Sequence, residues 1–293
     1  MLVSIFGNTC QETSLEDLCA FIKKLHNANI NIEIEQEFYD WLYSKGALQS
    51  LCSRTANPSP NSDMVISAGG DGTLLKAAYW AADRKIPVAG LNTGHLGFLT
   101  AWHIKDSSAL VDAIISNTLN IEERTLIKAS SPELPDNIWP FALNDISLLK
   151  ENSGSMITVK TSIDGIYLTD YEADGLLIAT PSGSTAYNLS AGGPILQPTA
   201  PALVLTPVAP HTLTMRPLVV CDTATISTVT TSRAGRFLLS IDGNTISLPA
   251  GSQIEISRAD FSLKLVRRAG DNFGTALRDK LLWGTSLTSG KNS

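Results

Sequence analysis

The stretch MVISAGGDGTLLKAAYWAA, residues 64–82, decides how the first part of this chain folds. Its first five residues are apolar or small, as in a buried strand, and its last nine predict a helix. Between them lies Gly-Gly-Asp-Gly-Thr, residues 69–73. Glycine lets the backbone come close to a ligand, and a helix N-terminus presents free N–H groups to an anion. Strand, glycine loop and helix in this order therefore predict a turn that faces phosphate.

Asp71 is the unusual residue of this loop. A carboxylate repels phosphate, so its presence indicates that it accepts a proton from a hydroxyl group or acts beside a metal ion. The loop matches neither the P-loop pattern nor the Gly-x-Gly-x-x-Gly fingerprint. The local sequence leaves a plainer alternative, a tight strand-to-helix turn in which Asp71 is a helix cap.

Strand and helix signals alternate through the first hundred residues. We expect strands near 2–6, 30–34, 64–68 and 87–91, and helices over 15–25, 37–51 and 74–82. This rhythm predicts a parallel sheet with helices on its faces, in which ligands bind at the carboxyl ends of strands. The glycine loops at 69–73 and 94–97 both follow such ends. We therefore expect a Rossmann-like α/β domain over residues 1–103.

From about residue 121 to residue 266 the pattern changes to short runs rich in Thr, Ser, Val and Ile. Asp164-Gly165 and Asp242-Gly243 predict hairpin turns between such runs. We expect a β-rich, β-sandwich-like second domain over residues 104–270. The tail, residues 271–293, has helical spacing over 273–283, and we expect it to pack back on the first domain.

Composition narrows the classes of function. The chain has 293 residues, 43% of them hydrophobic, and a net charge of −6, which argues against nonspecific nucleic-acid or anionic-membrane binding. No apolar run approaches membrane-spanning length, and the first residues resemble a strand more than a signal peptide. The four cysteines form no Cys-x-x-Cys pair, which favours reduced thiols in a cytoplasmic protein over a zinc site or disulfides.

A second unusual stretch is DGLLIATPSGSTAYNLSAGGP, residues 174–194. Here an apolar strand leads into a loop of small and hydroxyl-bearing residues. Such a loop exposes backbone amides and hydroxyls, which suits recognition of ribose, phosphate or carboxamide groups. Taken locally, a structural Ser/Thr turn explains the stretch equally well.

Together these segments resemble the NAD kinase family. The resemblance is carried, in order, by residues 69–73, 92–100 (NTGHLGFLT), 142–145 (ALND), 174–194, 206–211 (TPVAPH) and 216–218 (RPL). Diacylglycerol kinases and phosphofructokinases share the Gly-Asp-Gly loop alone, whereas 174–187 is much more specific. The resemblance implies transfer of the γ-phosphoryl group of ATP to the 2′-hydroxyl of the adenosine ribose of NAD. It further implies Mg²⁺ or another divalent cation held mainly by ATP, and a homodimer or homotetramer.

The resemblance also implies roles for single residues. Asp71 would be the general base that takes the proton of the ribose hydroxyl. Gly72, Asn144 and Asp145 would contact the adenosine of NAD, with Asp145 at a position where many family members have Glu. Asp174 would lie near the nicotinamide carboxamide. Further contacts to the dinucleotide would come from Thr185, Ala186, Tyr187, Ser190 and Asn244. No protein ligand for a metal ion is implied.

Two other functions stay open at this point. One is a lipid or sugar kinase that uses the same Gly-Asp-Gly loop, which would give a phosphorylated product other than NADP. The other is a regulatory protein that binds NAD or NADP without turning over ATP. The stretch 174–187 argues against the first, and an intact Asp71 argues against the second.

Overall fold

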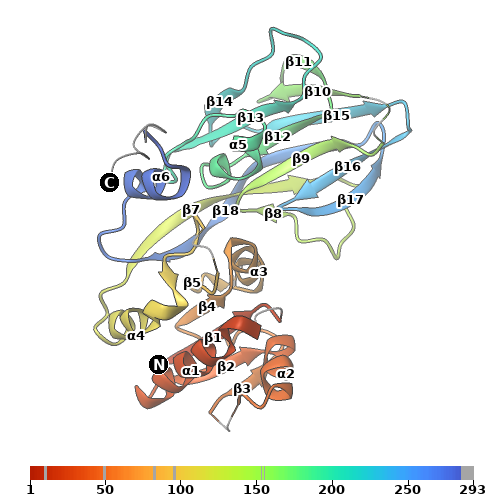
Figure 1. Cartoon of the computed structure of the whole chain (residues 1–293). Helices are drawn as coiled ribbons and strands as arrows, with labels where there is room; N and C mark the ends of the chain where they lie inside the picture. Colours follow the sequence, from red (N-terminus) through yellow and green to blue (C-terminus); the bar gives the residue numbers. More distant parts are fainter. Residues whose placement is uncertain are drawn as a thin grey trace. The chain divides into compact units, whose positions relative to one another are not determined.

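The computed structural model describes residues 1–9, 12–48, 51–81, 84–94, 97–152, 154 and 156–284. Internal contacts divide the chain into unit 1, Met1–Glu122 with Leu263–Ser293, and unit 2, Glu123–Ser262. This division follows Glu122 and not residue 103, because Leu110 and Ile114 of helix α4 belong to the core of unit 1. Figure 1 shows the elements of both units, and each unit is described by itself below.

Unit 1 contains a parallel sheet with the strand order β3-β2-β1-β4-β5. Its strands are β1 (Leu2–Gly7), β2 (Asn31–Glu35), β3 (Ser53–Thr55), β4 (Met64–Ala68) and β5 (Val88–Asn92). Two further parallel partners of β5 are β6 (Trp102–His103) and the last residues of β18 (Gln253–Arg267). The helices are α1 (Leu15–Asn27), α2 (Gln36–Ser44), α3 (Asp71–Ala81), α4 (Ser107–Ile115) and α6 (Phe273–Leu281), with 3-10 turns at Glu12–Ser14 and Ile104–Asp106. The predicted α/β domain is confirmed.

Helix α2 is shorter than the sequence predicts. It ends at Ser44, and Gly46 two residues later has a φ of 68°. A glycine in this left-handed conformation is a common helix stop, because it turns the chain away from the helix axis without a Cβ clash. The apolar spacing that continues toward residue 51 therefore does not extend the helix.

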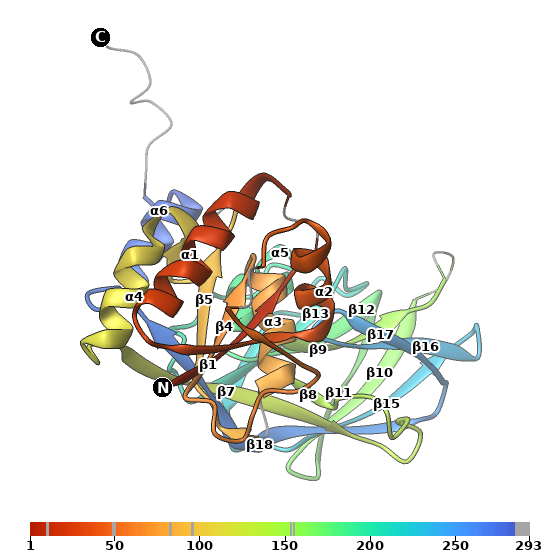
Figure 2. The same cartoon turned by 90° about the horizontal axis from the view of Figure 1, so that it is seen from below.

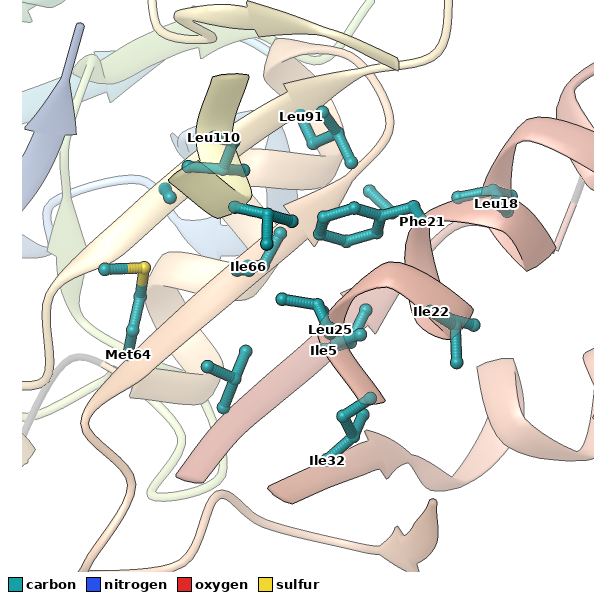
Figure 3. Close-up of a cluster of buried hydrophobic side chains, with 14 of the residues drawn as sticks. Ile5, Leu18, Phe21, Ile22, Leu25, Ile32, Met64, Ile66, Leu91 and Leu110 are labelled. Carbon is teal, nitrogen blue, oxygen red and sulfur yellow. The ribbon is translucent and has the colours of Figure 1, made fainter. Parts of the chain in front are cut away.

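Helices cover both faces of the unit 1 sheet. Side chains alternate across a strand, so Ile5 and Phe6 of β1 point to opposite faces. Ile5 joins a cluster with Phe21 of α1 and Leu110 of α4 (Figure 3), and α1 lies beside α4 in both views (Figures 1 and 2). Phe6 instead contacts Trp80 of α3, with ring centroids 5.8 Å apart. The sheet is thus doubly wound, and its strand order reverses between β1 and β4, where such folds bind ligands.

Unit 2 consists of two antiparallel sheets. One has the order β14-β13-β12-β9-β16-β17, and the other has the order β11-β10-β15-β18 with β7 and β8 attached through β18. Their bounds are β7 Asn120–Ser130, β8 Phe141–Ala142, β9 Asp145–Lys150, β10 Ile157–Ile163, β11 Ile166–Ala173, β12 Gly175–Ala179, β13 Ala202–Val208, β14 Leu218–Cys221, β15 Ile226–Ser232, β16 Arg236–Ile241 and β17 Asn244–Pro249. A 3-10 turn, Gly183–Thr185, and helix α5, Tyr187–Ser190, follow β12.

A shared core joins these two sheets. Ile157 and Val159 of β10 belong to the same buried cluster as Leu176 and Ile178 of β12. Because every second residue of each strand points inward, the two sheets face each other across this cluster. The predicted β-sandwich-like domain is confirmed.

Both predicted Asp-Gly hairpin turns are present. Asp164 and Gly165 have φ values of 50° and 78°, and Asp242 and Gly243 have values of 47° and 85°. Positive φ at both central residues is the geometry of a two-residue turn whose twist matches that of its strands. The turns connect β10 to β11 and β16 to β17.

Two further predictions concerned reduced cysteines and the lack of a membrane-spanning segment. Cys19, Cys52 and Cys221 are free thiols, and burial raises the pKa of Cys52 to about 11. Cys10 lies outside the described residues. Within the described part of the chain, no helix combines the length and the apolar character that a membrane span requires.

Candidate active site

A pocket of about 670 Å³ lies in unit 1 where the strand order reverses. Phe6 to Thr9, which end and follow β1, form one side of it, and Gly70, Gly72 and Thr73 at the start of α3 form another. Lys76 from the next turn of α3 also lines the pocket, together with Glu35 and Glu37. The pocket therefore combines a helix N-terminus, glycine backbone and one lysine, which are groups that bind phosphate.

The glycine loop takes a conformation that only small residues allow. Gly69 has a φ of 152°, and a Cβ at this position would overlap the side chain of Thr73. Its N–H donates to the carbonyl of Leu91 at 2.9 Å, which ties the end of β4 to β5. Helix α3 then begins at Asp71, and Gly70 and Gly72 are exposed. The predicted strand, loop and helix are confirmed.

The Asp71 carboxylate binds the loop that follows β5. One of its oxygens accepts from the amides of Phe98 and Leu99 at 2.6 and 3.1 Å, and the other from the amide and hydroxyl of Thr100, both at 3.1 Å. A Cβ on Gly97 would overlap this carboxylate, so a glycine is needed there. The two glycine loops of the sequence thus meet at Asp71; His95 and Leu96 lie outside the described residues.

Two cations hold the carbonyl side of the same segment, residues 97–100. The guanidinium of Arg267 donates to the carbonyls of Phe98 and Leu99 at 3.3 and 3.1 Å. Lys280 of α6 donates to the carbonyl of Gly97, and its ammonium lies 5.2 Å from the centre of the Phe98 ring. Burial lowers the pKa of Lys280, and the charge of Arg267 lowers it further, whereas Asp71 acts in the opposite direction. Unit 1 therefore places two positive charges near its glycine loops.

In unit 2, residues 143–145 form a short segment that is fixed on both sides. The carboxylate of Asp242 accepts from the amides of Leu143, Asn144 and Asp145 at 2.7, 2.8 and 3.0 Å. On the carbonyl side, the amide of Thr180 donates to Asn144 at 2.9 Å, and its hydroxyl donates to Leu143. The exposed residue Asn244 follows two positions after Asp242. Strand ends far apart in the sequence thus meet around Asn144.

Asp145 and Asp242 bring two carboxyl groups into one poorly solvated region. Asp145 is 6% exposed. Burial, and secondarily the charge of Asp242, raise the pKa of Asp145 to about 7. Burial also raises the pKa of Asp242 to about 6, against the lowering effect of its three amide donors. The pair therefore titrates close to neutral pH.

The loop after β12 contains buried side chains that hold its conformation and exposed side chains that do not. Ser184 and Asn188 are fully buried: the Ser184 hydroxyl bonds to Pro181 and Leu196, and the Asn188 amide accepts from Thr206 at 2.6 Å. Thr185 and Ala186 are half-buried, and Tyr187 and Ser190 are exposed. The side chains predicted to contact a dinucleotide are thus those that the fold leaves accessible.

Asp174 lies away from Asn144 and Asp145. It precedes β12, and Gly175 pairs with Leu149, whereas Ala179 at the other end of β12 pairs with Asp145. At about 3.3 Å per residue, this is a separation of roughly 15 Å along the strand. The Asp174 carboxylate is 2.7 Å from the ammonium of Lys150, an ion pair that the sequence analysis did not foresee.

Two family models match this chain. Residues 56–119 match the N-terminal domain of ATP-NAD kinases, and residues 143–268 match their C-terminal domain. An NAD kinase of Bacteroides fragilis is 40% identical over 285 residues, which are 97% of this chain and 98% of the relative. An NAD kinase of Porphyromonas gingivalis is 39% identical over 291 residues, or 97% of this chain and 99% of the relative.

The chain belongs to the NAD kinase family. Solved structures agree with this assignment. Yeast NADH kinase, crystallised with NADH, has a TM-score of 0.87 and 26% identity, with 99% of this chain and 90% of that chain covered. An NAD kinase from Archaeoglobus fulgidus in complex with ATP has a TM-score of 0.70 and 25% identity, with 91% and 93% covered.

Several residues of this NAD kinase family member were missed by the sequence analysis. Asp242 was predicted only as a turn residue, and Thr180, Arg267 and Lys280 were not singled out. All four act through contacts with segments at least 36 positions away in the chain. Their one available signal was charge or a hydroxyl beside a predicted loop, which is too common to identify a site.

Among the described residues, no group of three or more His, Cys, Asp or Glu side chains could surround a metal ion.

Proposed function

We propose that the chain is an ATP-dependent NAD kinase that converts NAD to NADP by phosphorylating the 2′-hydroxyl of its adenosine ribose. One observation carries the proposal: the chain is similar to NAD kinases over nearly its full length. The geometry of Asp71 and the adjoining pocket suits the same reaction. Enzymatic phosphoryl transfer depends mainly on positioning and on neutralising phosphate charge.

The pocket beside α3 is the proposed site for the phosphates of ATP. Free N–H groups at the start of α3 and the exposed backbone of Gly70 and Gly72 can donate to phosphate oxygens, and Lys76 adds a positive charge. Mg²⁺ or another divalent cation would arrive on the ATP phosphates, since Mg²⁺ keeps several waters and binds largely through substrate phosphates. When bound, it would offset the repulsion between ATP and the carboxylates of the pocket.

Asp71 is the proposed general base for the ribose hydroxyl. Its carboxylate accepts four hydrogen bonds, which is about the number of lone-pair positions that a carboxylate offers. To take a proton it must therefore exchange one donor for the ribose hydroxyl. The Thr100 hydroxyl is the contact most easily exchanged, because a hydroxyl can rotate whereas the three backbone amides are fixed; its oxygen accepts from the side-chain amide of Asn92 at 3.1 Å.

The dinucleotide contacts are proposed as follows. Asn144 offers one donor and one acceptor to the adenine edge, and Asp145 can accept from ribose hydroxyls when ionised. Gly72, which lacks a side chain and is exposed, allows close approach of the adenosine. Additional contacts are proposed for the accessible residues Thr185, Ala186, Tyr187, Ser190 and Asn244.

Asp174 is proposed to accept from the nicotinamide carboxamide with the oxygen that Lys150 does not hold. Its distance from Asn144 along β12 motivates a second proposal, that Asp174 serves the NAD site of a neighbouring copy in a homodimer or homotetramer. Exposed apolar residues on the edge strand β11, Ile166 and Tyr167, are 75% and 55% accessible and would be covered in such an assembly. We also propose a cytoplasmic location.

The test is NADP formation from NAD, ATP and Mg²⁺ by the purified protein, with Asp71→Asn alongside. We expect NADP from the wild type and a fall in turnover of roughly 10²–10⁴-fold in the variant, because an amide cannot take the hydroxyl proton. Asp112→Asn, at an exposed position of α4, is the matched control and should keep full activity. Near-normal turnover of Asp71→Asn contradicts the base, and binding of NAD without NADP formation by the wild type contradicts the reaction.

A further inference from the structure

The hairpin turn between β16 and β17 reaches into the segment that carries Asn144 and Asp145. Asp242 sits at the first turn position with a φ of 47°, and its own N–H donates to the carbonyl of Asp145 at 3.0 Å. Its carboxylate accepts the three consecutive amides of residues 143–145. A carboxylate bonded to backbone N–H groups makes charge-assisted bonds, which are stronger than neutral ones.

Consecutive amides that converge on one acceptor fix the peptide planes between them. With Leu143, Asn144 and Asp145 all directed at Asp242, the Cα–Cβ directions of Asn144 and Asp145 are set. Thr180 restrains the same segment through its carbonyls. Gly183 lies directly against the Asn144 backbone, where a Cβ would overlap it, so the segment has no room to move toward that side.

A second hairpin in unit 2 shows how many hydrogen bonds to the aspartate are sufficient to form an Asp-Gly turn. Asp164 has a φ of 50°, its N–H donates to the carbonyl of Thr225, and its carboxylate accepts from the amide of Thr225, both at 2.9 Å. The turn is thus built in the same way with one amide on the carboxylate. The other two amides held by Asp242 are additional to the needs of the hairpin.

We propose that Asp242 is a positioning residue for dinucleotide recognition, which holds residues 143–145 so that Asn144 and Asp145 meet the adenosine of NAD. The inference rests on the proposed function of Asn144 and Asp145. Asp242 acts through the backbone of these residues, so its removal should weaken the recognition of NAD and leave the recognition of ATP intact.

The test compares Asp242→Asn with its matched control, Asp164→Asn. Asparagine also tolerates a positive φ, so both turns should form, but its amide offers one acceptor oxygen and points an NH₂ group at backbone donors. We expect the KM for NAD and its directly measured Kd to rise roughly 10- to 100-fold in Asp242→Asn, because buried amides lose their acceptor. The KM for ATP of Asp242→Asn should stay within about twofold of wild type. The KM and Kd for NAD of Asp164→Asn should stay within the same limit, which is less than the effect of losing one hydrogen bond.

The outcomes separate positioning from general support of the fold. A purely structural role lowers the melting temperature and the active fraction but leaves the KM for NAD unchanged, and that result overturns the proposal. An equal rise in the KM for ATP also overturns it. If Asp242→Asn does not fold, Thr180→Val removes the bond to the Leu143 carbonyl from the other side, and an unchanged Kd for NAD in that variant overturns the proposal.

Asn144→Ala distinguishes failure of this inference from failure of the proposed function. If Asn144→Ala binds NAD weakly and Asp242→Asn binds it normally, Asn144 recognises NAD without help from Asp242. If Asn144→Ala binds NAD as well as the wild type does, the NAD site lies elsewhere, and the positioning role falls with it.

Discussion

Asp145 is buried, which favours its protonated form, whereas its proposed role in ribose recognition needs the ionised form. Burial and the charge of Asp242 favour the protonated form of Asp145, with a pKa of about 7. Accepting from two ribose hydroxyls requires the ionised form. A ligand that donates hydrogen bonds to Asp145 would stabilise the ionised form, so NAD binding should release protons near pH 7.

The same shift predicts a pH dependence of stability. An aspartate in the unfolded chain has a pKa near 3.9, so the raised value in the folded chain adds stability below about pH 4 that is lost as the pH rises through about 7. Asp145→Asn is neutral throughout. We therefore expect the melting temperature of Asp145→Asn, relative to wild type, to increase between pH 5 and pH 8.

Thermal unfolding followed by circular dichroism at several pH values measures this difference. Asp164→Asn, in an exposed hairpin turn, is the control, and its difference from wild type should stay flat. A flat difference for Asp145→Asn as well would mean that Asp145 is ionised in the fold throughout this range, contrary to the raised pKa.

In unit 1, segment 97–100 is held from both sides by charged side chains, one of them from helix α6. Asp71 binds the amides of the segment, and Arg267 and Lys280 bind its carbonyls. The charge of each partner matches the backbone dipoles that it meets. Segment 97–100 is therefore held by side chains from α3, β18 and α6 as well as by its own short-range bond from the Gly97 amide to the Thr100 hydroxyl.

Lys280→Met tests whether α6 contributes to catalysis. Methionine keeps much of the length but loses the ammonium, so the contacts with Gly97 and the Phe98 ring disappear. We expect kcat to fall roughly tenfold, as for the loss of one charge-assisted hydrogen bond, and amides 97–100 to exchange hydrogen faster. Arg278→Met, on the same helix, removes a bond to the Thr275 hydroxyl and should change neither quantity. Unchanged exchange in Lys280→Met would show that α6 does not hold the loop.

Local patterns were sufficient for the elements and insufficient for their contacts. The strand, loop and helix over 64–82 could be predicted because period, glycine and helix former all agree over neighbouring residues. Helix α2 ends at Ser44, and the only local sign of this end is Gly46. The prediction ran past it because the apolar spacing continues toward residue 51. Asp242 could be placed in its hairpin, but not beside Asn144, because that contact spans 98 positions and depends on strand order within the sheet.

The candidate site divides in the same way. Asp71, Asn144 and the loop after β12 were found through motifs, since each motif is continuous in the sequence. The ion pair of Asp174 with Lys150 follows from the course of β9 beside β12, which no continuous motif encodes. Resemblance could name the residues proposed to contact the ligand more readily than those that support them.

The whole molecule leaves an apolar edge uncovered. Ile166, Tyr167 and Leu168 of the edge strand β11 are 75%, 55% and 38% exposed. Exposed edge strands with apolar side chains pair readily with another chain. We expect the protein in solution to have a mass above that of the 31.3 kDa chain, and Ile166→Glu to shift it toward the monomer.

Sedimentation velocity over a range of concentrations measures this mass. Ile115→Glu is the matched control, because Ile115 is 61% exposed but lies on α4 of unit 1. A wild-type protein that sediments as a monomer at all concentrations contradicts the proposed homo-oligomer. An Ile166→Glu variant with unchanged mass would exclude β11 from the interface.

Arg267 and Lys280 also determine when, during synthesis, segment 97–100 can make all of its contacts. Arg267 and Lys280 leave the ribosome 169 and 183 residues after the Phe98 and Gly97 that they bind. At about 5–20 residues per second, the nascent loop waits on the order of 10 to 40 s for them. Unit 2, a continuous stretch, can fold during this interval. A message truncated before codon 267 would thus yield a β-rich unit attached to an α/β unit whose segment 97–100 lacks Arg267 and Lys280.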